Sequence, residues 1–304
     1  MRNTFSNIIT ELGKKDEKIL FLTGDLGFNA LEPVKDALGE RFINMGVAEQ
    51  NMVSAAAGFA YEGYKVFCYS IAPFIVYRCL EQTRNDVCFH NLPVFLVANG
   101  GGYGYGIMGM SHHTLDDLSC LSGLINMNCY IPAFKEDVSI AVKDILKRKA
   151  PAYLRLGLGK NNPFGNKINN FFNRLISNNK SKITVVGSGP VLNNVIAAVN
   201  SSNIKEKVDL FSVSRLPYEK LPQSFITSIS GTRKILIVEE HIRTGGIAEK
   251  ISYDLLSNKI KIDAFKSLYA LGYPGDVYGS QNFHFKRSFL DSESISRELE
   301  LLIK

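Results

Sequence analysis

The stretch Phe42-Ile-Asn-Met-Gly-Val-Ala-Glu-Gln-Asn-Met52 runs from a short apolar segment through a glycine into a helical pattern. Such a strand, turn and helix in succession are typical of a parallel sheet covered by helices. The acid Glu49 lies in the first turn of the predicted helix, where a negative charge interacts favourably with the helix macrodipole. This stretch therefore predicts one unit of an α/β fold.

Similar units recur along the chain. In the first half the predicted strands are Lys18–Thr23, Phe42–Met45, Val66–Ser70, Val94–Asn99, Asn128–Ile131 and Ala152–Leu156. Helices are predicted between them at about 47–61, 74–89, 114–122 and 137–149. In the second half the predicted strands are Ile183–Gly187, Val208–Val213, Ile235–Glu239 and Ala264–Leu268, with helices after Gly189, Pro217 and Gly245. We therefore predict an α/β protein with two doubly wound domains and mainly parallel sheets.

The alternation stops between the two halves. Residues 160–181 are rich in Asn and contain Pro163 and Gly165, a composition typical of a connecting segment. A chain of 304 residues is also long enough for two domains that each bury a core. We expect a first domain at 1–159, a linker at 160–181 and a second domain at 182–304.

Composition excludes several classes of protein. The apolar runs are far shorter than the roughly 20 residues that span a bilayer, so we expect no membrane segment. The net charge is +6, but the lysines are scattered and no basic run interleaved with aromatics indicates nucleic-acid binding. The N-terminus lacks an apolar signal core, and the five cysteines show no C-x-x-C spacing. We expect a cytoplasmic protein with free thiols.

The glycine-rich stretch at 100–109 contains a formal G-x-G-x-x-G at Gly104, Gly106 and Gly109. A nicotinamide-dependent dehydrogenase is therefore one alternative. That fingerprint requires an acidic residue about 20 positions further on, and residues 126–135 contain no Asp or Glu. The stretch is better interpreted as a glycine loop at the rim of a sheet.

A histidine block, Ser111-His-His-Thr-Leu-Asp-Asp117, follows the glycine loop. Adjacent residues of a helix or strand point in different directions, so His112 and His113 are a poor pair of metal ligands. The sequence also lacks a G-x-S-x-G elbow, an H-E-x-x-H motif and a phosphate-binding P-loop. We expect no metal to be held by this chain.

Taken in order, these motifs resemble the C-terminal half of a transketolase. The blocks that carry the resemblance are Thr23-Gly-Asp-Leu-Gly27, Gly46-Val-Ala-Glu-Gln-Asn-Met52, Ser70-Ile-Ala-Pro-Phe74, Arg78-Cys-Leu-Glu-Gln-Thr-Arg-Asn85, Gly109-Met-Ser-His-His113, Tyr153-Leu-Arg-Leu-Gly157 and Val238-Glu-Glu-His-Ile-Arg-Thr-Gly-Gly246. The G-V-A-E-Q-N and S-H-H blocks at this spacing are specific to the thiamine-diphosphate superfamily that includes transketolases and deoxyxylulose-phosphate synthases.

The resemblance implies that the first domain binds the aminopyrimidine ring of thiamine diphosphate. Glu49 matches the glutamate that hydrogen-bonds a ring nitrogen, and Phe74 matches the aromatic residue that stacks on the ring. Asp25 matches an acid near the thiazolium, and Ile71 and Tyr77 are expected in the same cofactor site. A buried carboxyl group can share a proton with a nitrogen base, which is the catalytic role implied for Glu49.

The resemblance also assigns roles to the histidine block. His112 matches the histidine beside the reacting carbon of transketolases, and His113 matches a second histidine of deoxyxylulose-phosphate synthases. An imidazole at this place can stabilise a developing alkoxide or move its proton. We expect both residues to be catalytic, with His112 as the stronger candidate.

One half of the family's machinery is missing from this chain. The family holds the diphosphate through a metal bound by a G-D-G motif and a later Asn, and this pair is absent from the sequence. The resemblance therefore implies a partner, an N-terminal transketolase-like subunit that supplies this site together with Mg²⁺ or Ca²⁺. We expect an α2β2 heterotetramer and an inactive isolated chain.

Substrate-contacting positions depart from the family pattern. Ile107 and Met108 replace an acidic pair that reads a donor hydroxyl, Gly100 replaces a phosphate-binding histidine, and Leu158 replaces an arginine. Without these charged contacts, a phosphorylated ketose is bound less tightly. We expect Ile107, Met108 and Arg155 to contact a sugar or keto substrate that is not a standard pentose phosphate, such as pyruvate or a nucleotide-linked sugar.

The function expected from the resemblance is transfer of a two-carbon ketol or acyl unit between carbonyl or sugar substrates. Two alternatives remain within the superfamily: the beta subunit of a 2-oxo acid dehydrogenase first component, and a non-catalytic scaffold. The S-H-H block favours a transketolase over the former, and the retained Glu49, Phe74 and His112 argue against the latter. The Glu239-Glu-His241 run receives no catalytic role.

Overall fold

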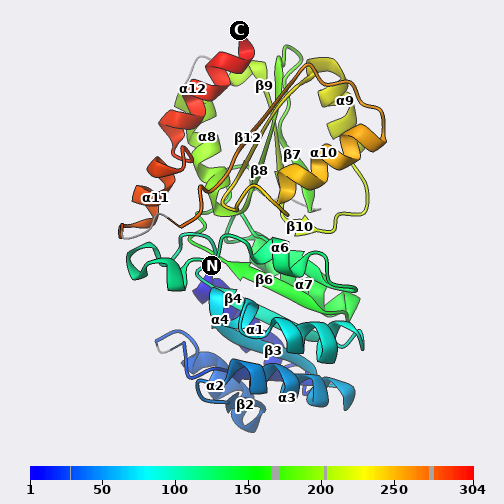
Figure 1. The fold of residues 1–304 in the computed structure, drawn as a ribbon. Helices are drawn as coiled ribbons and strands as arrows, with labels where there is room; N and C mark the ends of the chain where they lie inside the picture. The colour runs from blue at the N-terminus through cyan, green and yellow to red at the C-terminus, as the bar shows by residue number, and fades with distance from the viewer. Residues whose placement is uncertain (28, 166–170, 202–203, 274–276) are drawn as a thin grey trace.

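Two α/β halves are stacked one above the other in the computed structural model (Figure 1). The structure describes the whole chain except residues 28, 166–170, 202–203 and 274–276. Each half contains one sheet with helices on both faces, and the chain's C-terminus lies at the end of the second half away from the first (Figure 1). The predicted α/β class with mainly parallel sheets is confirmed.

The first sheet has seven strands in the order β10-β5-β6-β4-β3-β1-β2. Six of them come from the first half: β1 (Ile19–Thr23), β2 (Phe42–Asn44), β3 (Lys65–Ile71), β4 (Val94–Asn99), β5 (Asn128–Tyr130) and β6 (Ala152–Leu156). These six pair in parallel, and all but β2 are almost completely buried, as is typical of a parallel sheet covered on both faces. They lie within two residues of the predicted strands at either end.

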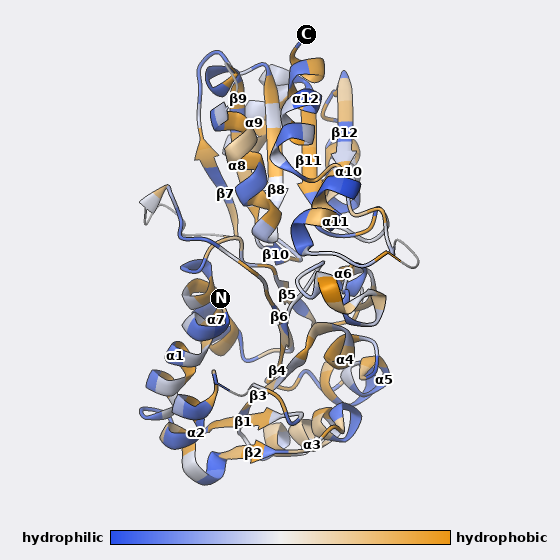
Figure 2. Ribbon diagram, turned by 90° about the vertical axis from the view of Figure 1, so that its left-hand side faces the viewer, coloured by the Kyte–Doolittle hydropathy of each residue, from blue (hydrophilic) through white to orange (hydrophobic). Residues whose placement is uncertain are grey.

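Helices cover both faces of this sheet. They are α1 (Arg2–Gly13), α2 (Glu32–Leu38), α3 (Glu49–Tyr61), α4 (Ala72–Val76), α5 (Leu80–Gln82), α6 (Asp117–Leu121) and α7 (Asp137–Arg148). Helices α1, α2 and α7 pack on one face, and α3 to α6 lie on the other (Figure 2). The single helix predicted at 74–89 is instead α4, α5 and a π-helical turn, Thr83–Cys88. The chain leaves helical geometry at Cys79, with φ −104° and ψ 14°.

The second sheet has five strands in the order β12-β11-β8-β9-β7. The strands are β7 (Phe172–Ile176), β8 (Ile183–Ser188), β9 (Val208–Val213), β11 (Lys234–Glu239) and β12 (Ala264–Leu268). The helices are α8 (Leu192–Ser201), α9 (Gln223–Thr232), α10 (Ile247–Ser257), α11 (Gln281–Arg287) and α12 (Ser292–Ile303). All strands are parallel except β7, which pairs antiparallel with β9.

Strand β7 lies inside the segment predicted to be a linker, so part of 160–181 is regular structure. Its Asn173 and Arg174 interrupt the apolar run and conceal the strand in the sequence. The strand sits at the edge of the sheet, where only one side is paired. The proposed domain limits at 159 and 182 remain a prediction.

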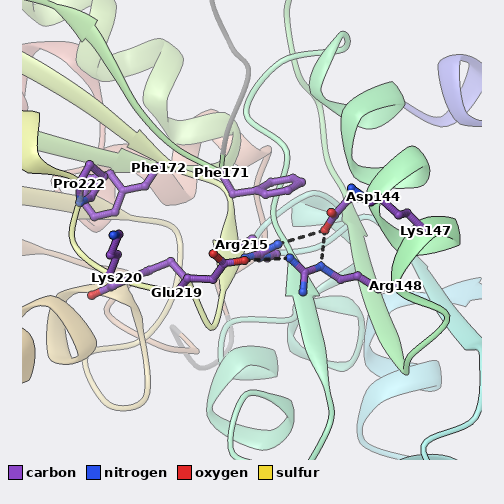
Figure 3. A pocket seen from close by; sticks show the side chains of 10 residues that line it. Asp144, Lys147, Arg148, Phe171, Phe172, Arg215, Glu219, Lys220 and Pro222 are labelled. Carbon is purple, nitrogen blue, oxygen red and sulfur yellow. Dashed lines mark hydrogen bonds and ion pairs between the residues drawn. The ribbon is translucent and has the colours of Figure 1, made fainter.

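One strand of the first sheet comes from the second half of the chain. Strand β10 (Arg215–Leu216) belongs to the second half, yet it pairs antiparallel with β5 of the first sheet, Arg215 opposite Tyr130. Beside this pairing, Arg215 lines a cavity together with Asp144 and Arg148 of α7 (Figure 3). Backbone hydrogen bonds between β10 and β5 therefore link the second half of the chain to the first sheet.

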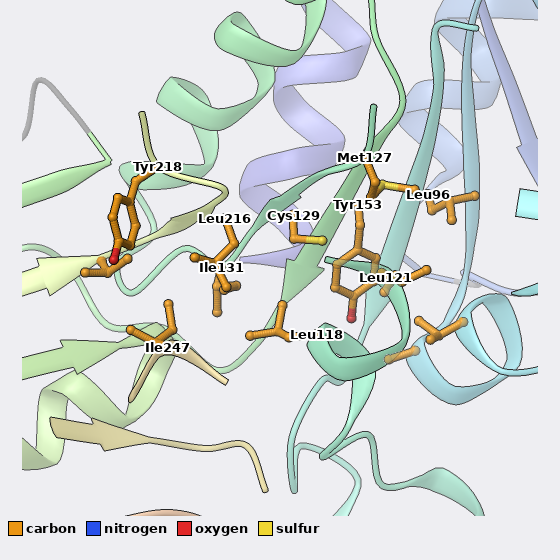
Figure 4. Packing of buried hydrophobic residues seen from close by; sticks show 14 of the residues in the cluster. Leu96, Leu118, Leu121, Met127, Cys129, Ile131, Tyr153, Leu216, Tyr218 and Ile247 are labelled. Atoms are coloured by element: carbon orange, nitrogen blue, oxygen red, sulfur yellow. The ribbon is translucent and has the colours of Figure 1, made fainter. Parts of the chain in front are cut away.

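A hydrophobic cluster also crosses the junction (Figure 4). It contains Leu118, Leu121 and Cys129 of the first half, together with Leu216 and Ile247 of the second. Burial of apolar surface is the dominant favourable contribution to folding, so the halves are held by a continuous core. Within the described ranges, no helix combines the length and apolar character needed to cross a membrane.

Candidate functional site

The expected site residues follow neighbouring strands at one edge of the first sheet. Strands β1, β3 and β4 are parallel neighbours, so their carboxyl ends face the same side. Asp25 follows β1, Phe74 lies just after β3, and the glycine loop follows β4. Glu49 comes after β2 at the start of α3. Segments far apart in the sequence thus converge at one rim.

Glu49 is almost completely buried at this rim. Its side chain is 1% exposed, and its two carboxylate oxygens have different partners. The Ser70 hydroxyl donates to Oε1 at 2.9 Å, and the Arg78 guanidinium donates to Oε2 at 2.5 Å. A Cβ placed at Gly24 would lie 3.3 Å from Oε1, so a glycine there leaves room for the carboxylate.

Phe74 and Arg78 connect Glu49 with the histidine block. The Arg78 guanidinium lies over the Phe74 ring at 4.5 Å, and the rings of Phe74 and His112 meet edge to face at 5.3 Å. Glu49, Phe74 and His112 therefore form one cluster, in which Arg78 joins Glu49 to Phe74 and the Phe74 ring contacts His112. We assigned no role to Arg78 from the sequence, although it begins one of the motif blocks.

The glycine loop supplies Tyr105 to the same cluster. Its ring lies 6.1 Å from that of His112, and its hydroxyl accepts a hydrogen bond from Asn99 Nδ2 at 2.6 Å. A Cβ at Gly100 would lie 2.1 Å from the Tyr105 ring, and Gly100 has a φ of +79°. The Tyr105 ring thus occupies the space that any side chain at position 100 would need. His112 Nδ1 lies 3.0 Å from the Ser111 hydroxyl.

His113 points to a different environment from that of His112. It is 1% exposed, and its Nε2 lies 3.1 Å from the Gly106 carbonyl oxygen. Burial lowers the pKa of His113 below its ordinary value, which favours the neutral imidazole. Tyr103 and His284 pack against its ring at 5.3 and 4.8 Å. These contacts make His113 a structural part of the loop.

Tyr77 is tied to the acid Asp116. Its hydroxyl donates to Asp116 Oδ1, which also accepts from the Tyr273 hydroxyl at 3.1 Å. Burial, followed by the hydrogen bond to Asp116, raises the pKa of Tyr77 well above its usual range. Ile71 ends β3 and is half-buried. Ile71 directly precedes α4 and Tyr77 directly follows it, and α4 carries Phe74 of the cluster.

Asp25 lies on a neighbouring cavity of about 360 Å³, lined also by Leu26, Gly27 and Asn44. The Asn44 side-chain amide donates to Asp25 Oδ1 at 2.8 Å, and the Asp25 backbone N–H donates to Asn44 Oδ1 at 3.0 Å. Asp25 has a φ of +57°, a left-handed conformation that Asp tolerates better than most residues. Its carboxylate is thereby fixed at the end of β1.

Arg155 requires a correction. It was expected to contact substrate, but it is 3% exposed, and its guanidinium is held between the two halves. Nη1 lies 3.4 Å from Asp117 Oδ1, and Nη2 donates to the Glu240 carbonyl oxygen at 2.8 Å. The Tyr153 hydroxyl donates to the same Asp117 at 2.5 Å. A guanidinium buried among these partners serves the junction and leaves no face for substrate.

Ile107 and Met108 lie at the surface of the glycine loop. They are 70% and 51% exposed, and Met110 is 57% exposed. The loop therefore presents an apolar rim close in sequence to His112. Within the described ranges, no group of three or more His, Cys, Asp or Glu side chains is arranged to hold a metal ion.

A family model described as the transketolase pyrimidine binding domain matches residues 1–162. The chain belongs to this family. Membership confirms the resemblance predicted from the motif blocks and implies thiamine diphosphate as the cofactor. It also argues against the nicotinamide-dependent dehydrogenase that the glycine loop left open as an alternative. In this structure the loop places the Tyr105 ring near that of His112.

Two relatives show how much of such proteins the chain represents. A subunit of the apulose-4-phosphate transketolase of Phocaeicola vulgatus is 27% identical over 97% of this chain and 95% of its own length. The 1-deoxy-D-xylulose-5-phosphate synthase of Clostridium perfringens is 26% identical over 99% of this chain but only 49% of its own. The chain thus spans nearly all of a transketolase subunit and about half of a synthase.

A solved structure of a split-gene transketolase, an inactive β4 tetramer, has the same fold. It superposes with a TM-score of 0.84 and 24% identity, covering 99% of this chain and 97% of that chain. This likeness shows that the fold extends over nearly the whole chain. The family model and the relatives support a transketolase-like transferase subunit.

Proposed function

We propose that this chain is the pyrimidine-binding subunit of a two-subunit enzyme that transfers a two-carbon ketol or acyl unit between carbonyl or sugar substrates. The observation that carries the proposal is the cluster of Glu49, Phe74 and His112, in which Arg78 links Glu49 to Phe74 and Phe74 contacts His112. These residues come from three separate motif blocks. Their convergence is what a shared cofactor site at the sheet rim requires.

The geometry of this chain fits the pyrimidine half of thiamine diphosphate. Glu49 presents a buried carboxylate beside Ser70, suited to a hydrogen bond with a ring nitrogen. The Phe74 ring supplies a flat apolar face, and Arg78 now lies over that ring. A ring stacked on the same face requires Arg78 to move. Thiamine diphosphate, when bound, supplies the stabilisation of a carbanion that transfer of such a unit needs.

His112 is the proposed acid and base of the site. It is half-buried beside Phe74, and its Nδ1 lies within hydrogen-bond distance of the Ser111 hydroxyl. If the hydroxyl donates to Nδ1, then Nε2 carries the proton and can donate it to a developing alkoxide. His113 keeps the loop in place through Gly106, which is a positioning role without direct contact with substrate.

The substrate proposal rests on the exposed Ile107 and Met108. An apolar rim in place of an acidic pair favours a smaller or less hydroxylated donor, or an acceptor recognised by other groups. The Tyr105 ring reinforces this point, because it fills the space beside Gly100, the position at which the family resemblance implies a phosphate-binding histidine. We therefore propose that standard pentose phosphates are poor substrates.

The partner proposal rests on the extent of the chain. The relative in Phocaeicola vulgatus is a subunit of similar length, and the synthase is about twice as long. We propose that an N-terminal subunit supplies the diphosphate site with Mg²⁺ or Ca²⁺, that the pair forms an α2β2 heterotetramer, and that it acts in the cytoplasm in carbohydrate metabolism. The β4 tetramer described for a split-gene transketolase is inactive, which supports the need for a partner.

The test is reconstitution. The chain is co-purified with a candidate N-terminal subunit carrying G-D-G, supplied with thiamine diphosphate and Mg²⁺, and assayed for carbonyl transfer. Glu49→Gln should abolish turnover while the complex still assembles, as judged by light scattering. Glu62→Gln, at the exposed C-terminal end of the same helix, should leave turnover unchanged. Full activity of the Glu49 variant, or rapid turnover of xylulose 5-phosphate with ribose 5-phosphate, would contradict the respective parts of the proposal.

A further inference from the structure

A cavity of about 470 Å³ lies at the junction of the two halves (Figure 3). Helix α7 of the first half forms one wall, and the segment after β10 in the second half forms the opposite wall (Figure 3). The lining residues are Asp144, Lys147, Arg148, Phe171, Phe172, Arg215, Tyr218, Glu219, Lys220 and Pro222. None of them belongs to the cluster around Glu49. The volume is within the range of roughly 300–1,000 Å³ found for small-molecule sites.

The charges of the lining are unequal. Four side chains are cationic and two are carboxylates, which leaves an excess of positive charge. Asp144 Oδ2 accepts from Arg148 Nε at 2.6 Å and from Arg215 Nη1 at 3.0 Å. Glu219 lies 3.3 Å from Arg148 and 3.6 Å from Arg215. The two carboxylates thus neutralise the two arginines.

Lys147 and Lys220 have no such compensation. Both are exposed, and neither has a carboxylate within ion-pair distance in the part of the chain that the structure describes. Two ammonium groups at the edge of a cavity attract an anion, and that attraction is stronger than on a flat surface because the walls exclude water. The Glu219 side chain is 78% exposed, so it can leave the arginines when a stronger anion arrives.

A simpler explanation accounts for only half of these charges. Lys147 and Arg148 lie in the last turn of α7, where cations favourably oppose the helix macrodipole. Arg215 and Lys220 come from the second half of the chain, so they do not belong to the basic last turn of α7. Arg215 is nearly buried, with 6% of its side chain exposed, and its charge is compensated by Asp144.

Aromatic side chains complete the cavity. The Arg215 guanidinium lies over the Phe171 ring at 4.7 Å, and this contact fixes the orientation of the guanidinium plane. Phe172 packs against Tyr218 with ring centroids 5.4 Å apart. The lining therefore combines paired arginines and exposed lysines with an apolar floor formed by Phe171, Phe172 and Pro222.

We propose that this cavity binds a small phosphate-bearing organic anion. The phosphate groups pair with Lys147 and Lys220 and take the place of Glu219 on Arg148, since guanidinium groups bind phosphate in the same bidentate manner as carboxylate. The sugar or ring of the ligand rests on the apolar floor. The proposal is independent of the function proposed for the Glu49 cluster.

Occupancy of this cavity bridges the two halves. Lys147 and Arg148 belong to α7, while Arg215 and Lys220 belong to the second half, so one ligand contacts both (Figure 3). A ligand that binds only the folded chain raises its unfolding temperature by mass action. The site is thus suited to an effector that strengthens the junction without entering the site around Glu49.

The test uses the full chain and two probes, pyrophosphate and ADP, in magnesium-free buffer. Binding is measured by titration calorimetry and by the shift of the unfolding temperature. The double variant Lys147→Gln/Lys220→Gln should bind both probes at least tenfold more weakly than the unmodified chain. The control Lys180→Gln/Lys205→Gln removes the same charge from two exposed lysines elsewhere and should bind normally.

Each outcome is informative. Tighter binding of ADP than of pyrophosphate supports the apolar floor, and Phe171→Ala should remove that preference. Equal binding of the two probes, with loss in the double variant, supports the phosphate contacts and overturns the role of the floor. Equal affinity of the two double variants, or no binding of either probe at millimolar concentration, overturns the proposal.

Discussion

His113 and His284 hydrogen-bond the same atom, the carbonyl oxygen of Gly106, through their Nε2 atoms at 3.1 and 3.3 Å. A carbonyl oxygen only accepts, so both imidazoles donate from Nε2. The lone pair of a neutral His113 then lies on Nδ1, which has no hydrogen-bond partner among the described residues. Because His284 comes from α11 and His113 from the loop after β4, this shared acceptor joins the second half to the histidine block.

The first prediction separates the two contacts of His284. Its ring stacks on Tyr103 at 4.8 Å in addition to donating to Gly106. His284→Phe keeps the stack and loses the hydrogen bond, so we expect the free energy of unfolding to fall by about 1 kcal/mol. His284→Ala loses both and should cost about 3 kcal/mol. Urea unfolding measures both, and equal losses in the two variants would show that the stack contributes nothing.

Local pattern predicted the central strands but not the edges of the sheets. Strands such as β4 and β8 are mostly apolar and almost completely buried because both of their faces are covered by helices. Strand β10 has only two residues, and β7 contains Asn173 and Arg174, so neither stands out in the sequence. Both owe their existence to a neighbouring strand that local sequence does not reveal.

In the candidate site, too, some features could be predicted from the sequence and others could not. The motif blocks led to Glu49, Phe74 and His112, and the structure brings these together. They did not reveal Arg78 as the contact between Glu49 and Phe74, because that contact depends on the direction of one long side chain. Arg155 was misjudged because its partner Glu240 lies in the other half of the chain. Such long-range pairings are set by tertiary packing and leave no local pattern.

A second prediction concerns the pair of Arg78 and Glu49. Arg78→Met retains a long apolar side chain over Phe74 but leaves the buried carboxylate without its cation. A hydrogen bond to a charged group contributes about 1.5–3 kcal/mol, and we expect a loss of unfolding free energy in that range. The double variant Glu49→Gln/Arg78→Met should recover part of the loss, because no buried charge is then unpaired. Additive losses in a double-mutant cycle would show that the two residues do not interact.

A third prediction compares a buried ion pair with an exposed one. Asp117 is completely buried and pairs with Arg155, so Asp117→Asn removes the carboxylate within ion-pair distance of the guanidinium. Breaking a buried pair in this way costs about 3–5 kcal/mol. The control is Asp263→Asn, which removes the partner of Arg233 at the surface and should cost less than about 1 kcal/mol. Denaturant unfolding of both variants gives the comparison, and similar losses would contradict it.

The last prediction concerns pH and Glu239. Its carboxylate is 2% exposed and accepts from the backbone N–H groups of Ile247 and Ala248 at the start of α10. Burial raises the pKa of Glu239 to about 7, partly opposed by those hydrogen bonds. The folded state therefore keeps a proton that the unfolded state releases, so stability from this group falls as pH rises from about 4.5 to 7.

Between pH 5 and 7.5 the loss from Glu239 amounts to about 2 kcal/mol. The Glu239→Gln variant has no ionisable side chain at this position. Its free energy of unfolding should therefore fall less than that of the unmodified chain over this interval, and the difference should equal that amount. The amide is a weaker acceptor for the backbone N–H groups at the start of α10. Burial lowers the pKa of His113 and His241, which acts in the opposite direction but equally in both proteins. Urea unfolding at the two pH values gives the difference, with Glu300→Gln, an exposed acid of α12, as the control. Parallel pH profiles for all three proteins would show that Glu239 is ionised throughout.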